Sequence, residues 1–382
     1  MIFKKIRVLK WQILSLIYKK DHYRYKIYMY NHQNKNFILK KYSHLINKKF
    51  SSFGMKKYPR REEIGGDYCL FKYLYIPGIK AYNLGDYIQT IATRSLIELI
   101  DKNAKFHFYN RDSFSLYNKK ESICIMQGWF ADDYNFLPNE RIFPVYIGTH
   151  FTKKMQEYFD VLNVDFKDFE IGCRDLSTLD YFNKKGANAY FSRCLTLTLP
   201  KREVSAKQNS IFLVNLNHEM SSLLPDFIKK EAIEINQKAI KIKNRNLKNE
   251  WQECYKEAQD ILEKYASEAK LVITTALHCA APCIALGIPV ILLQEDKVYE
   301  DRFSALKGIL KPYTFNDLKD NRIDFEPKIL DIEFLKEMMI KNLKLTLKKH
   351  MFTLNKDEEK ELNSIRNKIA HFKNNMILFL KT

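Results

Sequence analysis

Two histidines and one arginine stand at points of the sequence where chemistry is expected. His150 ends the run VYIGTH, His278 opens a helical segment directly after the run LVITT and the residues AL, and Arg174 follows a short apolar segment. In open α/β sheets, ligands bind at the carboxyl ends of the strands. Arginine offers a planar fork of donors to a carboxylate or a phosphate, and a histidine at a helix N-terminus stays a neutral base near pH 7. These residues predict an anion-handling acid–base site, with structural histidines and a structural Arg174–aspartate pair as the alternative interpretation.

Two short motifs supply neighbours for this site. The motif NLGD at residues 83–86 follows a predicted strand and opens a helix. Within it, Asn83 and Gly85 allow close approach to free N–H groups that can hold an anion, whereas Asp86 would serve equally well as an ordinary N-cap. Asp175 is expected to cap the next helix, with Thr178 three residues further on.

Residues 271–294 form the longest uncharged stretch of the chain. Its length alone makes it a candidate for a membrane-spanning helix. However, a β-branched run is followed by a segment rich in alanine, cysteine and leucine, then by Gly287 and a second β-branched run. This order predicts the strand–helix–strand unit of a buried parallel sheet, with Gly287 ending the helix.

The rest of the chain repeats this alternation. Strands are predicted at residues 68–75, 105–109, 122–127, 142–147, 169–173, 189–192 and 195–199, and helices at 87–100, 152–162 and 176–185. After a polar linker at 200–210, strands at 211–215 and 232–235 and a helix at 251–269 lead into the uncharged stretch. The pattern predicts two α/β lobes with the site in the cleft between them.

The C-terminal tail has apolar residues at helical spacing. They are Leu362, Ile365, Ile369, Phe372, Met376 and Phe379. The repeat is too short for an independent coiled coil, so the tail is expected to dock on the body of the protein.

The cysteines argue against a disulfide framework and against zinc. They number seven, are scattered and lie mostly in apolar runs, which favours reduced, buried thiols. No CxxC pair or second histidine–cysteine cluster completes four ligands around Cys279 and Cys283, so no metal site is predicted. The motifs of dinucleotide-binding, P-loop, zincin and α/β-hydrolase proteins are not present in the sequence.

The positive charge is concentrated at the N-terminus. Residues 1–61 carry 17 lysines and arginines against one acid, Asp21, whereas the rest of the chain carries 47 bases and 44 acids. Basic residues mixed with tryptophan, tyrosine, isoleucine and leucine favour a segment that lies on an anionic membrane surface. An inert extension packed on the body and a nucleic-acid-binding arm are the alternatives, and nucleic acid is not expected as a partner.

Taken in order, several segments resemble the polysaccharide pyruvyl transferase family. They are NLGDYIQTIA, QGWF, FPVYIGTH, GCRDLSTLDYFNKKG, SRCLTLTLP, the long segment AQDILEKYASEAKLVITTALHCAAPCIALGIPVI, and the DRF of residues 301–303. The resemblance covers roughly residues 70–305. It implies two Rossmann-like lobes in a GT-B-like arrangement, at residues 66–204 and 205–325, between a basic arm at 1–65 and a helical tail at 326–382.

The resemblance also implies an activity: transfer of a pyruvyl group from phosphoenolpyruvate onto two sugar hydroxyls, which gives a cyclic ketal and phosphate. The acceptor would belong to a surface polysaccharide, such as a capsule or exopolysaccharide, or to its precursor, including a lipid-linked one. Phosphoenolpyruvate is then a substrate, and no cofactor is implied. The expected location is cytoplasmic, peripheral on the inner face of the membrane.

The resemblance assigns roles residue by residue. Arg174 would hold the anions of the donor, Leu277 and His278 would lie at its phosphate, and His278 and His150 would be the acid–base residues. The further residues expected to bind substrate are Asn83, Gly85, Asp86, Gly128, Trp129, Asp175, Thr178, Arg193 and Arg302.

One position departs from the family pattern. An arginine is common two residues before the histidine, and Ala276 occupies that position here. Arg193 and Arg302 are the candidates to replace the missing cation. The alternatives are a GT-B-type glycosyltransferase, for which Glu295 and Asp296 would contact a sugar nucleotide, and a non-catalytic family member in a glycan assembly complex.

Overall fold

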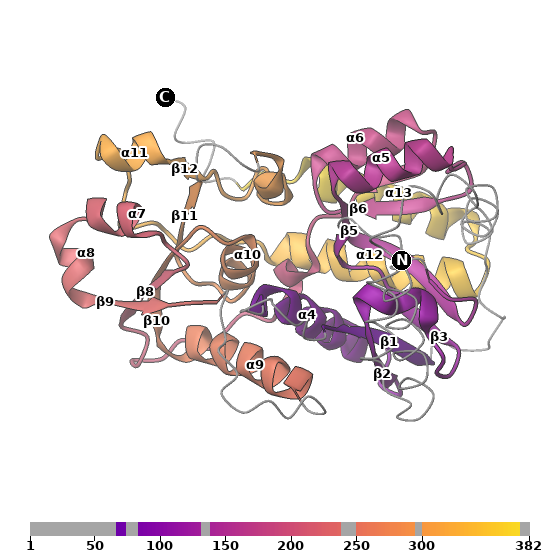
Figure 1. Ribbon diagram of the computed structural model, residues 1–382, viewed down its shortest axis with the longest axis horizontal. Coiled ribbons are helices and arrows are strands. Elements are labelled where there is room, and N and C mark those ends of the chain that lie inside the picture. Colours follow the sequence, from indigo (N-terminus) through magenta and orange to yellow (C-terminus); the bar gives the residue numbers. More distant parts are fainter. Residues whose placement is uncertain (1–65, 74–82, 131–137, 238–249, 295–299, 375–382) are drawn as a thin grey trace, which may run out of the picture.

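Two α/β lobes lie side by side in the computed structural model, each built around one parallel sheet (Figure 1). The structure describes residues 66–73, 83–130, 138–237, 250–294 and 300–374. The first sheet contains β1 to β7 and the second contains β8 to β12. The predicted linker at residues 200–210 therefore joins the two sheets.

The first sheet is wholly parallel, with the order β2-β1-β3-β5-β6-β7 and β4 paired to β5. Its strands are β1 (Asp67–Lys72), β2 (Lys105–Asn110), β3 (Ser122–Ile125), β4 (Gly128–Phe130), β5 (Ile142–Phe151), β6 (Glu170–Cys173) and β7 (Asn188–Phe191). Strands β1, β3 and β5 are almost entirely buried, because helices cover both faces of a parallel sheet.

The helices of this lobe begin at the residues that cap them. They are α4 (Leu84–Ile100), α5 (Lys153–Leu162) and α6 (Leu176–Lys184), with the 3-10 turns η1 (Arg111–Leu116) and η3 (Leu195–Thr198). Asn83, Thr152 and Asp175 each accept a backbone N–H from the first turn of the helix that follows. Such caps satisfy donors that have no partner within the helix.

The predicted strand at residues 195–199 is wrong. This segment forms η3, whose turn is closed by a hydrogen bond from the Thr198 hydroxyl to the carbonyl of Leu195, 2.8 Å. It packs against α4, α10 and α12, and Leu195, Thr196 and Leu197 are all buried. Because Thr196 is buried as deeply as the leucines and Thr198 alone of this turn is partly exposed, the alternation of leucine and threonine does not mark a strand with one solvent-facing side.

The second sheet repeats the order of the first, β12-β11-β10-β8-β9, again wholly parallel. Its strands are β8 (Ser210–Val214), β9 (Ala232–Ile235), β10 (Ala269–Thr274), β11 (Val290–Gln294) and β12 (Tyr313–Thr314). Around it lie α7 (His218–Leu223), α8 (Asp226–Glu231), α9 (Glu250–Glu268), α10 (Leu277–Ala285), η4 (Glu300–Leu306) and α11 (Phe315–Lys319). In each lobe the second strand lies on one side of the first and the third on the other, which creates a switch point between them.

The uncharged stretch at residues 271–294 is the β10–α10–β11 unit. Gly287 follows the helix with φ +75°, the left-handed conformation that glycine adopts without strain. Within the described residues, no helix is long and apolar enough to cross a bilayer. All seven cysteines are free and buried, as expected for reduced thiols.

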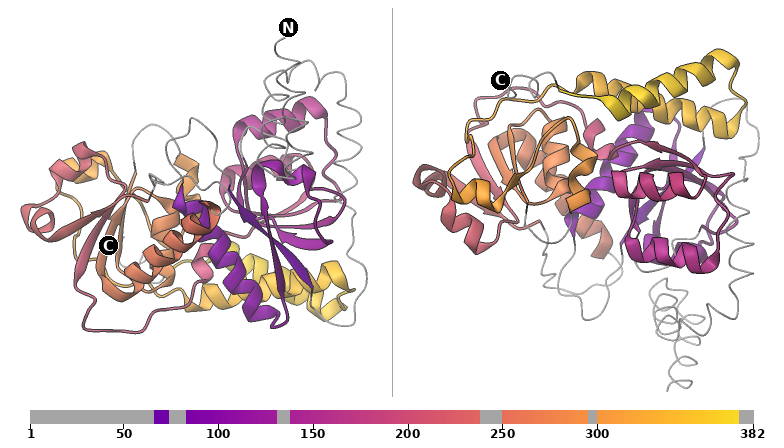
Figure 2. Two further views of the ribbon diagram at one scale, coloured as in Figure 1. Left: turned by 60° about the horizontal axis from the view of Figure 1, so that its bottom comes forward. Right: turned by 90° about the horizontal axis from the view of Figure 1, so that it is seen from above.

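The last two helices, α12 (Glu333–Met351) and α13 (Lys356–His371), return to the first lobe and pack behind its sheet (Figure 2). Arg366 of α13 anchors them: its Nη2 lies 2.7 Å from Oε1 of Glu170 and its guanidinium carbon 3.7 Å from the centre of the Tyr190 ring. The predicted helix positions Met376 and Phe379 lie outside the described residues.

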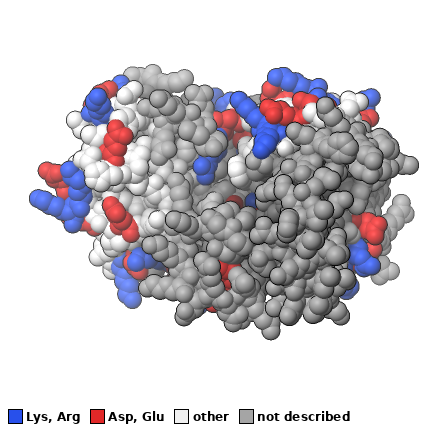
Figure 3. Space-filling model, in the orientation of Figure 1, with Lys and Arg blue, Asp and Glu red and all other residues white. Residues whose placement is uncertain are grey.

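Charges of both signs are interspersed on the described part of the face shown in Figure 3. Ion pairs along single helices of the described chain include Lys229 with Asp226 and Lys256 with Asp260. The basic arm at residues 1–61 lies outside the described residues, so the structure does not test its predicted role.

Candidate active site

The N-termini of α4 and α10 meet at the junction between the two lobes. Each helix follows a strand beside its sheet's switch point, α4 after β1 and α10 after β10. The backbone N–H of Leu84 donates to the carbonyl of Gln237, which follows β9, at 3.1 Å. The carboxyl edges of both sheets therefore face the same place, the location at which such folds bind ligands.

Gly85 is a point of close contact between the two helices. A methyl group built on Gly85 would lie 2.9 Å from Cβ of His278 and 3.2 Å from its Nδ1. A side chain at this position would displace the histidine. The group that comes close to Gly85, as the sequence predicts for this residue, is therefore the side chain of His278. The contact fixes the His278 ring against the first turn of α4.

The first N–H groups of α4 are already satisfied. Leu84 donates to Gln237, the N–H of Gly85 donates to Oδ1 of Asn83 at 3.1 Å, and the N–H of Asp86 donates to the Asn83 carbonyl at 3.1 Å. Asn83 and the second lobe supply these acceptors, and the binding of an anion by these groups stays a prediction. Asp86 is also not the cap; its Oδ1 accepts from Nε2 of Gln89 at 3.2 Å.

Arg174 joins the two lobes through its guanidinium. The residue follows β6 and is buried, with Nη1 at 3.3 Å from Oε1 of Gln89 and 3.4 Å from Nε2 of His278. Among the described residues its Nε has no hydrogen-bond partner, and its ion pair to Asp175 is long, at 3.9 Å. A buried donor without a partner is costly, so this nitrogen is available to an anion.

The start of α10 adds positive potential beside Arg174. Its N-cap is Ala276, which has no side-chain acceptor, and no side chain among the described residues caps the helix. The first turn contains Leu277 and His278, both buried. A helix N-terminus without a side-chain cap favours a negatively charged group.

His278 is held in its neutral form. Burial lowers the pKa of its imidazole well below 6.5, and the positive charges of Arg174 and Arg302 and the nearby His150 lower it further. Among the described residues, its Nδ1 has no partner. A neutral imidazole beside an anion site is suited to accept a proton from a hydroxyl group.

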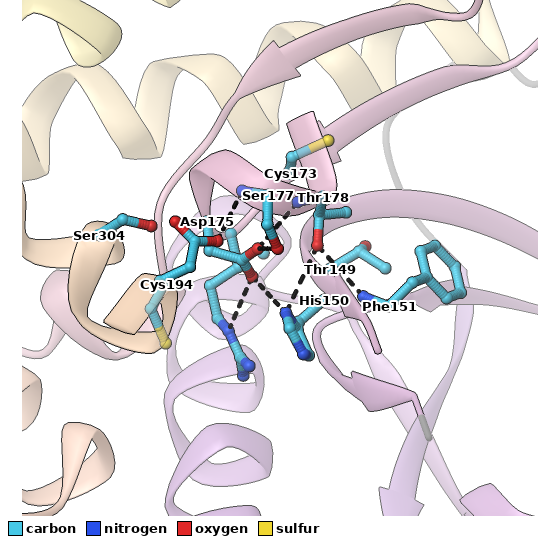
Figure 4. A network of polar contacts seen from close by, with 12 residues as sticks. Thr149, His150, Phe151, Cys173, Asp175, Ser177, Thr178, Cys194 and Ser304 are labelled. Carbon is cyan, nitrogen blue, oxygen red and sulfur yellow. Dashed lines mark hydrogen bonds and ion pairs between the residues drawn. The ribbon is translucent and has the colours of Figure 1, made fainter. Parts of the chain in front are cut away.

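His150 forms a hydrogen-bonded pair with Asp175 (Figure 4). Its Nδ1 lies 2.5 Å from Oδ2 of Asp175, and Thr178 contacts the same nitrogen at 3.4 Å. Burial lowers the pKa of His150, although the hydrogen bond that its ring donates to Asp175 opposes this. Burial would raise the pKa of Asp175, but the hydrogen bond from His150 and the charges of His150 and Arg174 lower it on balance. A neutral His150 thus donates through Nδ1 to an ionised Asp175 and leaves Nε2 as the base.

Asp175 and Thr178 act through His150. Both side chains are fully buried, and Oδ1 of Asp175 accepts the N–H of Thr178 at 3.0 Å as the cap of α6. The contacts of these two predicted substrate-binding residues thus run to His150 and to the start of α6. The start of α6 is also occupied from the second lobe, because Ser177 N donates to Oδ2 of Asp301 at 2.6 Å.

Trp129 presents an aromatic surface beside His150. It lies in β4 between the buried residues Gly128 and Phe130, with its own ring 40% exposed. The indole and the imidazole are parallel within 3°, with centres 6.4 Å apart. An exposed, fixed aromatic ring next to a base is suited to pack against the face of a sugar ring.

The two candidate replacement arginines have different surroundings. Arg302 lies in η4 and acts electrostatically on both Asp86 and His278, so the structure brings it to the site. Arg193 is completely buried and donates to the carbonyls of Ile369, Ala305, Lys307 and Phe372. The structure does not bring Arg193 to the histidines; it binds the C-terminal helix to the loop after η4.

A family model described as polysaccharide pyruvyl transferase matches residues 83–297. This range runs from the N-cap of α4 to just beyond β11 and contains Arg174, His150 and His278. It covers more than half of the chain. The chain belongs to the polysaccharide pyruvyl transferase family. The basic arm and the helices α12 and α13 lie outside the part that matches.

Two further comparisons add little to the family assignment. A search of curated proteins gave no match. Among solved structures, a functionally uncharacterised protein from Klebsiella pneumoniae is 15% identical, with 72% of this chain and 94% of that chain covered and a TM-score of 0.36.

Sequence reasoning missed two glutamines that connect the residues of the candidate site. Gln89 bridges Asp86 and Arg174, and Gln237 donates through Nε2 to the carbonyl of His278 at 3.0 Å. Both are buried. The sequence contains a signal for each of them. Gln89 lies one helical turn after Asp86. Gln237 follows the end of a strand, which is the rule that selected the histidines.

Proposed function

We propose that this protein transfers a pyruvyl group from phosphoenolpyruvate onto two hydroxyls of a sugar in a surface polysaccharide or its precursor. The products would be a cyclic ketal and inorganic phosphate. Family membership supports a pyruvyl transferase that acts on polysaccharide. The choice of phosphoenolpyruvate and of ketal formation rests on the chemistry of the site.

One observation carries the proposal: a buried arginine with an unpartnered Nε faces a neutral histidine at an uncapped helix N-terminus. Phosphoenolpyruvate carries a carboxylate and a phosphate ester on the same carbon atom. The Arg174 fork and the start of α10 supply donors of the kind that such a pair of anions requires. Departure of phosphate needs the same fixed positive potential.

The two histidines suit the acceptor half of the reaction. A ketal forms when two hydroxyl groups attack the same carbon, and each hydroxyl loses a proton. His278 and His150 are both held neutral at the junction of the lobes, so each is ready to take one proton. Trp129 would support the sugar ring beside His150.

Ala276 leaves the site without the cation that the family pattern has two residues before the histidine. Its side chain is small and buried, 7% exposed. Arg302 is the candidate that we propose takes over this charge, because it already lowers the pKa of His278. Arg193 is excluded from this role by its four carbonyl contacts.

We further propose a GT-B-like arrangement of the lobes and an acceptor at the inner membrane surface. Two parallel sheets of the same strand order, joined by helices that return to the first lobe, support the arrangement. The membrane part is supported by the basic, aromatic-rich sequence of residues 1–61.

The experiment combines the purified protein with phosphoenolpyruvate and a panel of glycans and lipid-linked sugars. Phosphate release together with a ketal methyl signal in the product is the expected result. Thermal stabilisation by a sugar nucleotide, with none from phosphoenolpyruvate, would instead indicate a glycosyltransferase. Glu295 and Asp296, which that alternative invokes, lie outside the described residues.

A further inference from the structure

We propose that Asp86 is the acid that protonates the methylene carbon of the donor. The proposal rests on the pyruvyl transfer argued above and adds an acid to its two histidine bases. Asp86 follows Gly85, the residue that touches His278, in the first turn of α4.

A continuous chain of polar contacts links Asp86 to the centre of the site. Nε2 of Gln89 donates to Oδ1 of Asp86 at 3.2 Å, and Oε1 of Gln89 accepts from Nη1 of Arg174 at 3.3 Å. The same arginine nitrogen lies 3.4 Å from Nε2 of His278. The Gln89 amide is buried and used at both ends, so it holds the Asp86 carboxyl in a fixed position relative to Arg174.

Asp86 differs from the structural carboxylates of the described chain. Asp175 and Glu170 each form short ion pairs, whereas Asp86 forms none within the described residues and its Oδ2 has no hydrogen-bond partner there. The residue is partly exposed, unlike Asp175. A carboxyl whose Oδ1 accepts one hydrogen bond and whose Oδ2 is unengaged has the arrangement of a carboxylic acid ready to donate.

The groups around this carboxyl raise its pKa on balance. The charged and titratable groups that face it are Tyr73 after β1, Arg111 and Asp112 in η1, Arg174 after β6, and Arg302 in η4. Withdrawal from water raises the pKa of Asp86 and Asp112 adds to this, while the three arginines lower it; the net direction is upward. The negative charge of a bound donor would raise it further.

The reaction requires such an acid in addition to the bases. The O–H bond of Asp86 breaks and the π electron pair of the donor forms a C–H bond at the methylene carbon, which becomes the methyl group. The first hydroxyl then bonds to the neighbouring carbon and gives its proton to one histidine. The bond to the phosphate oxygen breaks with its electron pair on phosphate, the second hydroxyl takes its place, and its proton passes to the other histidine.

The protons balance at the end of the cycle. One imidazolium gives its proton to the departing phosphate, and the other returns its proton to the Asp86 carboxylate. Both histidines end neutral, Asp86 ends protonated, and no oxidant or further reactant is needed. A site with two neutral imidazoles alone would have no group that starts the cycle with a transferable proton.

The test compares Asp86→Asn and Asp86→Glu with Glu98→Gln, a control that removes an exposed carboxylate from the same helix. Asp86→Asn should bind phosphoenolpyruvate with a Kd within about 3-fold of the parent and lose about 100-fold to 10,000-fold in kcat, the range of general acid catalysis. Asp86→Glu should recover part of this loss, and Glu98→Gln should stay within about 3-fold of the parent. The alkaline limb of the kcat profile should shift in Asp86→Glu and vanish in Asp86→Asn.

A spectroscopic measurement tests the acid without turnover. The infrared difference spectrum of the parent protein against Asp86→Asn at pH 7 should contain the carbonyl band of a protonated carboxylic acid. An absent band, or a kcat in Asp86→Asn within about 3-fold of the parent, overturns the proposal. Absence of any ketal with the parent protein would instead refute the proposed function, so the two failures are distinguishable.

Discussion

Replacing Gly85 with alanine adds one methyl group at the contact between α4 and His278. Two opposing effects decide the result. Alanine is favoured over glycine within a helix by about 1 kcal/mol. The new methyl would lie 2.9 Å from Cβ of His278 and 3.0 Å from Oδ1 of Asn83, well inside normal contact. Because carbon atoms pack at about 3.5–4.0 Å, the histidine must move by close to 1 Å, and such overpacking costs about 1–3 kcal/mol.

The stability of Gly85→Ala is therefore expected to fall by about 0–2 kcal/mol. Its activity should fall much further, since a displacement of about 1 Å at a reacting group lowers the rate about 100-fold. Urea unfolding measures the first quantity and phosphate release from phosphoenolpyruvate the second. The signature of the contact is a loss of activity out of proportion to the loss of stability.

Gly186→Ala is the matched control. Gly186 has φ +74° and no atom within 4 Å of an added methyl, so alanine meets only backbone strain there. It should lose about 1–2 kcal/mol of stability and keep its activity. A Gly85→Ala protein that gains about 1 kcal/mol and turns over normally would refute the contact between α4 and His278.

Three further predictions follow from the same structure. Burial would raise the pKa of Glu170, but its pairing with Arg366 and Lys349 lowers that pKa from 4.5 to about 2. The ionised side chain should thus contribute about 3 kcal/mol to the free energy of unfolding, present above pH 4.5 and lost as the pH falls toward 2. Glu170→Gln should flatten this part of the acid-unfolding curve. Asp175→Asn should lower kcat at least 100-fold while the fold persists. Because the Asp175 carboxylate raises the pKa of His150, this variant should also move the acid limb of the rate profile to lower pH. Arg193→Met should lower stability by about 2–4 kcal/mol, measured by urea unfolding, yet leave the affinity of the folded protein for phosphoenolpyruvate within about 2-fold.

Much of the fold follows from the sequence because its elements are locally encoded. The helix at residues 251–269 and the unit at 271–294 were predicted to within two residues of α9, β10, α10 and β11. Their apolar spacing reflects one buried side or a wholly buried strand. The failure at residues 195–199 has the opposite cause, since both leucines and Thr196 of this turn are buried and the burial does not alternate along it.

The site was predictable in part. Arg174 and His278 were selected because each follows a strand end, and the structure brings them together although 104 residues separate them. The partners of the α4 N–H groups and the carbonyls around Arg193 come from distant segments, so no local pattern encodes them. For the same reason, the sequence could not distinguish Arg302 from Arg193 as the cation of the site.

The most direct measurement is an NMR assay with phosphoenolpyruvate labelled with ¹³C at its methylene carbon, a sugar acceptor, and either the parent protein or its Arg174→Met and His278→Ala variants. The parent should convert the methylene signal into a ketal methyl signal and release an equal amount of phosphate, and each variant should lose at least 100-fold in rate while remaining folded. Ketal formation at the parent rate in both variants would contradict the assignment of this site.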